Sequence, residues 1–110
     1  RAALTALGTF NTILNPTLQA AGSAPIIGNS GGNGITLASG NTIRGLTVGA
    51  TSATKIFGNA FGTLVVGNTT TPDVALTGAG KLLDLTNGTF DATSAFSSIA
   101  STSSAAGQHG

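Results

Sequence analysis

Residues 51–64 read TSATKIFGNAFGTL, and residues 77–90 read TGAGKLLDLTNGTF. The two stretches align without a gap at an offset of 26 positions, with five identical residues and three conservative apolar matches. A repeat of this length is typical of one coil of a solenoid, because three short strands of about 4 residues and their turns use that many residues. Equivalent residues of the two copies should therefore lie side by side on parallel strands of one sheet. We expect Lys55 beside Lys81 and Leu64 beside Phe90.

Strand signals recur along the rest of the chain. Short runs rich in Thr, Val, Ile and Leu are each bounded by Gly, Asn or Ser, and several alternate apolar with polar residues, as in a half-buried sheet. Helix formers are scarce, since Glu is absent, and only residues 2–7 and 94–100 suit helical turns. The predicted strands are 12–14, 25–27, 34–38, 41–48, 55–57, 63–66, 74–77, 81–86 and 89–92.

The recurring apolar spacing also predicts which side chains point inward. In a strand of period 2, every second side chain faces the same side of the sheet. We expect these side chains to be mostly buried: Ile35, Leu37, Ile43, Leu46, Val48, Ile56, Leu64, Val66, Leu76, Leu83, Leu85 and Phe90.

The composition limits the classes of function. Charged residues make up 6% of the 110 residues, against about 25% in a typical globular domain. The net charge of +1 provides no basic patch for nucleic acid. Cysteine is absent, so there is no disulfide framework, and no run of 18 apolar residues predicts a transmembrane helix. A surface so poor in charge fits a chain covered by more of itself or by neighbours.

The segment GITLASGNTIRGLTV at residues 34–48 resembles the G-I-x-L-x-x-G-N-T-[IV]-x-G-L-T-[IV] pattern of right-handed parallel β-helix proteins of the pectate-lyase-like superfamily. Residues 61–68 and 83–90 look like the following coils in large bacterial surface proteins with β-strand repeats. The resemblance covers about residues 25–99. It implies an all-β, right-handed parallel β-helix of about 3–4 coils with a period near 26 residues. It says little about activity, because the superfamily includes lyases, adhesins, autotransporter passengers and phage tailspikes.

We expect a single β-solenoid module over residues 1–110. Residues 1–24 would form an N-terminal cap or an irregular first coil, residues 25–99 the coils, and residues 100–110 a tail. The chain opens with Arg1 and contains no Met, which indicates a processed or excerpted sequence. The module is expected to be cut from a longer β-helix or built to stack head to tail.

Carboxylates are the residues on which catalysis would depend. Polysaccharide-cleaving enzymes of the resembled superfamily cluster acidic residues around calcium or a scissile bond, often beside a Lys or Arg. This chain has only Asp73, Asp84 and Asp91. Asp84 and Asp91, with Lys81 or Arg44 nearby, are the best candidate cluster. Calcium usually takes about 6–8 oxygen ligands, so dispersed Asp residues do not supply a site. We predict no catalytic, cofactor-binding or metal-binding residue, and no enzyme.

Other motifs favour structural interpretations. His109 has neither Cys nor a neighbouring acid, so it cannot make a specific metal site. The glycine-rich stretches 31–34 and 78–81 lack the Lys-Ser/Thr ending of a phosphate loop and are predicted turns. Asn residues at corners can hydrogen-bond the coils above and below, or simply serve the turns. These residues are Asn41, Asn59, Asn68 and Asn87.

These observations favour a passive structural or adhesive module, located outside the cell or on a bacterial cell surface. The expected partners are copies or neighbouring coils of the same protein, with a host surface or a polysaccharide as further candidates. Nucleic acid is not an expected partner. The alternative is a β-sandwich subunit of a surface filament, in which a subunit donates a strand to its neighbour. This alternative leaves the 26-residue register unexplained. A polysaccharide-binding or polysaccharide-cleaving β-helix is less favoured.

Overall fold

The computed structural model describes residues 22–29 and 31–102. Within these residues the chain is all-β, as predicted, and forms no helix. Accordingly, nothing in this part of the chain is a helix long and apolar enough to cross a membrane. The strands of the described part are β1 (Ile26–Asn29), β2 (Ile35–Thr36), β3 (Asn41–Ile43), β4 (Leu46–Thr51), β5 (Thr54–Val66), β6 (Val74–Leu76), β7 (Lys81–Phe90) and β8 (Ser98–Ile99).

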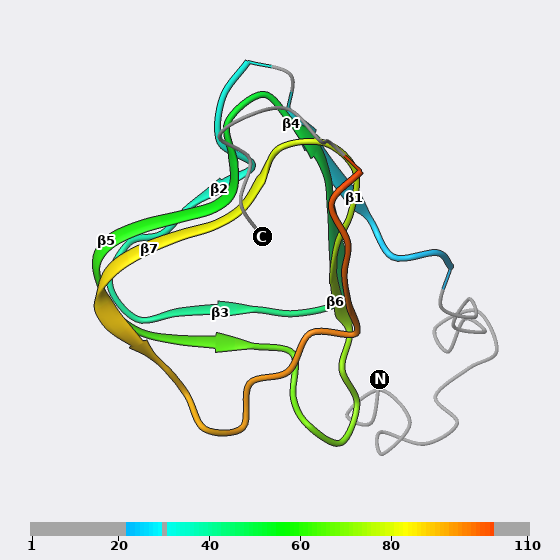
Figure 1. The fold of residues 1–110 in the computed structure, drawn as a ribbon. Coiled ribbons are helices and arrows are strands. Elements are labelled where there is room, and N and C mark those ends of the chain that lie inside the picture. The colour runs from blue at the N-terminus through cyan, green and yellow to red at the C-terminus, as the bar shows by residue number, and fades with distance from the viewer. Residues whose placement is uncertain (1–21, 30, 103–110) are drawn as a thin grey trace, which may run out of the picture.

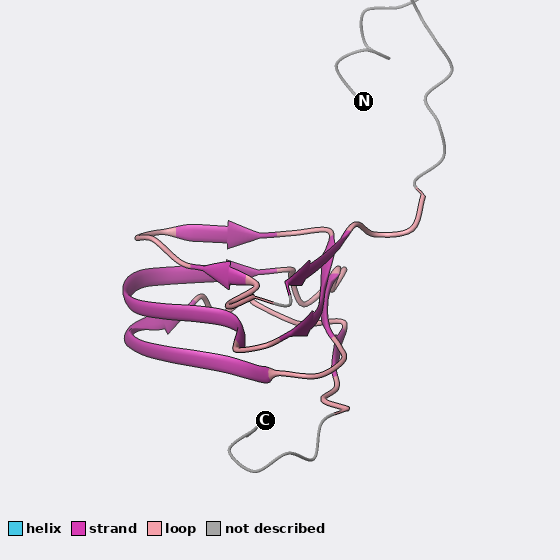
Figure 2. Cartoon of the chain, turned by 90° about the horizontal axis from the view of Figure 1, so that it is seen from above, coloured by secondary structure: helices cyan, strands magenta, loops and turns pink. Residues whose placement is uncertain are grey.

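The strands form two parallel sheets. One has the order β1-β4-β6-β8, and in the other the long strand β5 pairs with β2, β3 and β7. All the strand pairs of the described residues are parallel. Viewed end on, the strands of each sheet nearly superimpose along one three-sided outline (Figure 1). Turned by 90°, they lie side by side in a row (Figure 2).

Paired residues lie roughly one repeat apart in the sequence. The separation ranges from 21 positions between Ile26 and Thr47 to 28 between Leu46 and Val74. Backbone hydrogen bonds outside the strands keep the same spacing, such as the bond of 2.8 Å from the Ala100 amide to the Leu76 carbonyl. Parallel strands need a long connection between partners, and the chain supplies one of about this length each time.

The second half of the internal repeat stacks as predicted. Leu64 pairs with Phe90 and Thr63 with Thr89, both at the offset of 26. The prediction is confirmed for this half of the repeat. It follows that the sequence similarity between the two copies marks residues that are neighbours on adjacent strands.

The first half of the repeat is displaced by one residue. Thr54 pairs with Lys81 at an offset of 27, so the prediction that Lys55 lies beside Lys81 is wrong. The physical reason is a register shift between Asn59 and Gly62, where residues 60–61 of β5 lie between the pairs that Asn59 and Gly62 make, opposite residue 87 alone. Ala60 and Asn87 both have left-handed φ values, of 54° and 55°. One extra residue at such a bulge shifts the pairing register of all the residues on one side of the bulge by one position, and it bends the strand.

The predicted inward side chains form the core, with one exception. Of the twelve, seven are buried and four are partly buried, whereas Phe90 is 43% exposed. Phe90 is exposed because β7 pairs only with β5 in the described residues, which leaves one side of β7 uncovered. Three further apolar side chains outside the predicted set are also buried, and these are Phe61, Val74 and Leu82.

Several predicted strand boundaries differ from those observed. The predicted strand 41–48 divides into β3 and β4 near Gly45, whose φ of 64° suits glycine. Predicted strands 55–57 and 63–66 are joined in β5, and 81–86 and 89–92 are largely joined in β7. The helical turn expected at 94–100 is wrong, since these residues include β8. The predictions for residues 2–7 and 12–14, and most of the expected cap and tail, lie outside the described residues.

Gly88 is expected to be intolerant of a side chain. A Cβ built there would lie 2.5–2.6 Å from ring atoms of Phe61, which is only 2% exposed and so has little room to move. Overpacking of this kind costs about 1–3 kcal/mol. Gly88→Ala should therefore lower the free energy of unfolding by that amount in urea titrations. Gly28→Ala is the matched control, because its Cβ would meet only the Ala50 carbonyl at 4.0 Å. Equal stability of the two variants would contradict the packing described here.

Candidate functional site

Four of the partly exposed ionisable side chains form two ion pairs. Arg44 Nε donates to both carboxylate oxygens of Asp73 at 3.1 and 3.0 Å. Lys81 Nζ donates to Asp84 Oδ2 at 2.9 Å. These ion pairs are partly exposed, so each stabilises the fold by no more than about 1 kcal/mol. Their main consequence is that Asp73 and Asp84 each already have a cation beside them.

Asp91 is tied to its own turn. Its Oδ1 accepts hydrogen bonds from the Thr93 hydroxyl at 2.5 Å and from the Thr93 amide at 2.9 Å. The bond from the Thr93 hydroxyl, and to a lesser extent the bond from its amide, lower the pKa of Asp91 below its ordinary value, because they favour the ionised carboxylate. A carboxylate held in this way is a weak base and is already ionised near neutral pH.

The structure does not assemble the candidate acidic cluster. Lys81 does lie beside Asp84, but Arg44 binds Asp73, and Asp91 bonds within its turn. Residues 22–29 and 31–102 contain no group of three His, Cys, Asp or Glu side chains that could hold a metal. His109 lies outside the described residues. Among the described residues, four of these charged side chains form two ion pairs, Arg44–Asp73 and Lys81–Asp84.

Two of the four Asn residues connect neighbouring strands. Asn59 Oδ1 accepts a bond of 3.1 Å from Asn87 Nδ2 and one of 3.3 Å from the Thr86 hydroxyl. Asn41 and Asn68 instead bond to groups three residues away within their own turns. The polar side chains at the bend of β5 and β7 thus bridge the two strands, which agrees with a structural use of Asn59 and Asn87.

Lys55 lies in an environment that the sequence did not predict. Its side chain is fully buried, and its ammonium donates to the backbone carbonyl of Ala79, in the turn that precedes β7. Burial lowers the pKa of Lys55 below its ordinary value, because an ammonium loses its hydration there. Because this ammonium is buried, its contact is within the fold, where Lys55 ties the start of β5 to the turn before β7. The glycine-rich stretch 78–81 correctly indicated a turn. Nothing in the sequence indicated that Lys55 would donate a hydrogen bond to Ala79 in this turn.

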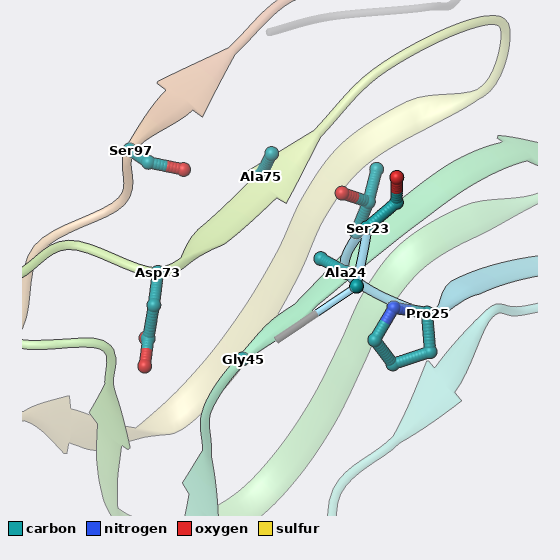
Figure 3. A pocket seen from close by; sticks show the side chains of 9 residues that line it. Ser23, Ala24, Pro25, Gly45, Asp73, Ala75 and Ser97 are labelled. Atoms are coloured by element: carbon teal, nitrogen blue, oxygen red, sulfur yellow. The ribbon is translucent and has the colours of Figure 1, made fainter. Parts of the chain in front are cut away.

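A pocket of about 590 Å³ opens on the outer face of the first sheet (Figure 3). Residues 23–25 lie on one side of it, and Asp73, Ala75 and Ser97 on the other. The lining residues are Gly22, Ser23, Ala24, Pro25, Gly45, Thr47, Asp73, Ala75 and Ser97. These are small side chains with no aromatic ring, and the one ionisable member, Asp73, is paired with Arg44. Ligand pockets are usually lined by larger apolar groups with a few convergent polar ones, so this lining does little to orient a ligand.

The edges of the two sheets carry the apolar surface. In the described part of the chain, the large exposed apolar side chains are Ile26 (72%), Phe90 (43%) and Ile99 (51%). They lie on β1, β7 and β8, which are all edge strands. Phe90 also packs edge-to-face with Phe96, with ring centroids 6.4 Å apart. Exposed sheet edges with apolar side chains are sites for further strand pairing, which makes them the candidate functional surface.

Comparisons of the chain with protein-family models, with curated proteins and with solved structures find no match.

The buried lysine predicts a pH dependence of stability. Between the lowered pKa of Lys55 in the folded protein and its ordinary value near 10.5, the unfolded chain holds more protons than the folded chain. The free energy of unfolding should therefore rise with pH across that window, and Lys55→Met should lack this part of the rise. Urea unfolding between pH 7 and pH 10 measures it, and the chain has no Cys or Tyr to titrate in the same range.

Lys81→Met is the matched control for this experiment. It removes a partly exposed lysine and leaves Lys55 in place, so it should keep the rise in stability. If Lys55→Met and the unsubstituted protein gain stability equally with pH, Lys55 is not buried as described.

Proposed function

We propose that this chain is a segment of a right-handed parallel β-helix that acts as a passive structural or adhesive element of an extracellular or bacterial cell-surface protein. In this proposal its task is to extend a rigid stack, and its two ends are contact surfaces. The location rests on the resemblance of residues 61–68 and 83–90 to coils of large bacterial surface proteins with β-strand repeats.

The single observation that carries the proposal is an apolar column through the first sheet. Ile27 pairs with Val48, Val48 with Leu76, and Leu76 with Ile99. The two middle members are fully buried. In a β-helix each coil places its equivalent residue directly above that of the coil below, about 4.8 Å away, so such columns are expected in every sheet. A right hand is expected because about 98% of parallel crossover connections have it.

The parallel pairing favours this architecture over the sandwich alternative. Sandwich domains are built from antiparallel sheets. In this chain β5 pairs in parallel with β7, and residues 62–64 keep the 26-position offset. A donor-strand filament subunit offers no reason for that offset.

A passive role is supported by the placement of the charged groups. The ionisable side chains of the described residues are engaged locally, as in the Arg44–Asp73 pair, or buried, as Lys55 is. Enzymes that cleave glycosidic bonds with two carboxylates need them within about 10 Å of each other across an accessible cleft. The 590 Å³ pocket contains a single carboxylate. These features favour a scaffold over a polysaccharide-cleaving enzyme.

The proposal predicts that the chain tolerates one added repeat but not half of one. Duplicating residues 51–76 in place adds one coil, whose residues would enter the existing columns. The variant should stay folded, and its denaturant m-value should rise roughly in proportion to the added length. Duplicating only residues 51–63 is the matched control. These 13 residues make up half a coil, so every later strand would be placed opposite the wrong sheet. Circular dichroism and urea unfolding compare the two variants.

A sandwich would be disrupted to a similar extent by both insertions. Equal loss of cooperative unfolding in the two variants would therefore contradict the proposed function.

A further inference from the structure

We propose that Asn87 is a site of spontaneous deamidation, at which the backbone amide of Gly88 attacks the Asn87 side chain and converts it to an aspartyl residue. Water is the only co-reactant that this reaction needs. The inference goes beyond the proposed function, because it concerns a reaction of the chain itself and does not depend on what the chain binds or supports.

The chemistry follows from the two residue types. The Gly88 nitrogen forms a bond to Cγ of Asn87, its proton passes to the side-chain nitrogen, and ammonia leaves. One water molecule then opens the resulting five-membered succinimide at either of its two carbonyls. The product is an aspartate with the ordinary backbone, or an isoaspartate in which the main chain runs through the side-chain carboxyl. Glycine hinders the attack least of all residues, because it has no Cβ beside the attacking nitrogen.

The Gly88 amide is oriented so that it is not used in pairing with β5. Amides two residues apart in a strand point to the same side. The Asp91 amide donates to the Leu64 carbonyl of β5, and the register of β7 is unbroken from residue 88 to residue 90. The Gly88 amide therefore points away from β5. Asn87 and Gly88 are both exposed, so water reaches both reacting groups.

A single weak restraint holds the Asn87 side chain. In the part of the chain that the structure describes, its one hydrogen bond runs from Nδ2 to Asn59 Oδ1 at 3.1 Å. Asn59 is exposed as well, and an exposed hydrogen bond between neutral groups opens readily because water replaces it. The Asn87 carboxamide can therefore turn its Cγ toward the Gly88 nitrogen.

The chain contains a second Asn-Gly pair, at residues 33–34, which the fold protects. The Gly34 amide donates to the Thr54 carbonyl at 2.9 Å, and Asn33 Oδ1 accepts a bond of 3.1 Å from the Thr54 amide. A Cβ on Gly34 would lie 2.7 Å from Val48 Cγ1, so the backbone there has little room to rotate. Asn33 is thus an internal control with the same dipeptide and both of its reacting groups held.

Deamidation would change the bend of β5 and β7 in two ways. The nitrogen that bridges Asn87 to Asn59 is lost, and a carboxylate oxygen takes its place beside Asn59 Oδ1. Asn59 Oδ1 then keeps only its bond of 3.3 Å from the Thr86 hydroxyl. The new carboxylate also lowers the net charge of the chain from +1 to zero, and a protein without net charge associates more readily.

Incubation of the purified chain in mildly alkaline buffer, followed by peptide mapping with mass spectrometry, measures the reaction at each Asn. We expect aspartate and isoaspartate to accumulate first at position 87, while Asn33 stays intact in the folded chain. In urea, where both pairs lose their structure, the ratio of the two rates should fall to about one. Equal rates at Asn33 and Asn87 in the folded chain would overturn the inference. So would a rate at Asn87 no higher than at Asn41 and Asn68, which both precede Thr.

Asn59→Ala tests the restraint on the side chain. It removes the acceptor of the Asn87 hydrogen bond and leaves both Asn-Gly pairs in place, so the reaction at Asn87 should become roughly threefold to tenfold faster. Asn68→Ala is the matched control, because Asn68 bonds to Thr71 within its own turn, and the rate at Asn87 should not change. An unchanged or lower rate at Asn87 in Asn59→Ala would contradict the inference.

Discussion

The parallel hydrogen-bonded pairing between successive passes of the chain is the constraint on which the rest of the structure depends. It fixes the neighbour of each strand residue about one repeat further along the sequence. An inward position must therefore be apolar in several strands at once, as in the column from Ile27 through Val48 and Leu76 to Ile99. Each member of such a column is buried mainly by the members above and below. Burial is consequently complete in the middle of the stack and incomplete at its edges.

The same constraint explains the less regular features. The bend between the two halves of β5 and β7 needs a small residue at Gly88, because the ring of Phe61 fills the space beneath it. The turn before β7 lies over the start of β5, which encloses the Lys55 side chain and provides the Ala79 carbonyl for its ammonium. A buried lysine is costly unless its charge is hydrogen-bonded, and here the neighbouring turn supplies the acceptor.

Much of the fold was predictable from the sequence, because the repeat period, the alternation and the turn residues all report local geometry. The pairing of Leu64 with Phe90 followed from the 26-residue offset alone. The position of Lys55 did not, because one extra residue near Ala60 changes the register and leaves no clear trace in the alignment. The exposure of Phe90 was also missed, since periodicity shows which way a side chain faces but not whether a further strand covers it. The residue types suggested few side chains that could take part in catalysis or metal binding. The exposed sheet edges could not be located from the sequence, because they depend on which strands pair in the folded chain.

The central claim is that the strands of the chain pair in parallel and in register. Cross-strand nuclear Overhauser effects between Val48 and Leu76, and between Leu64 and Phe90, measure this most directly. The account predicts contacts from Hα of one strand to backbone amides of its neighbour, without strong contacts between facing Hα protons. Strong Hα-to-Hα contacts, which antiparallel strands produce, or the absence of any contact between these residue pairs, would contradict it.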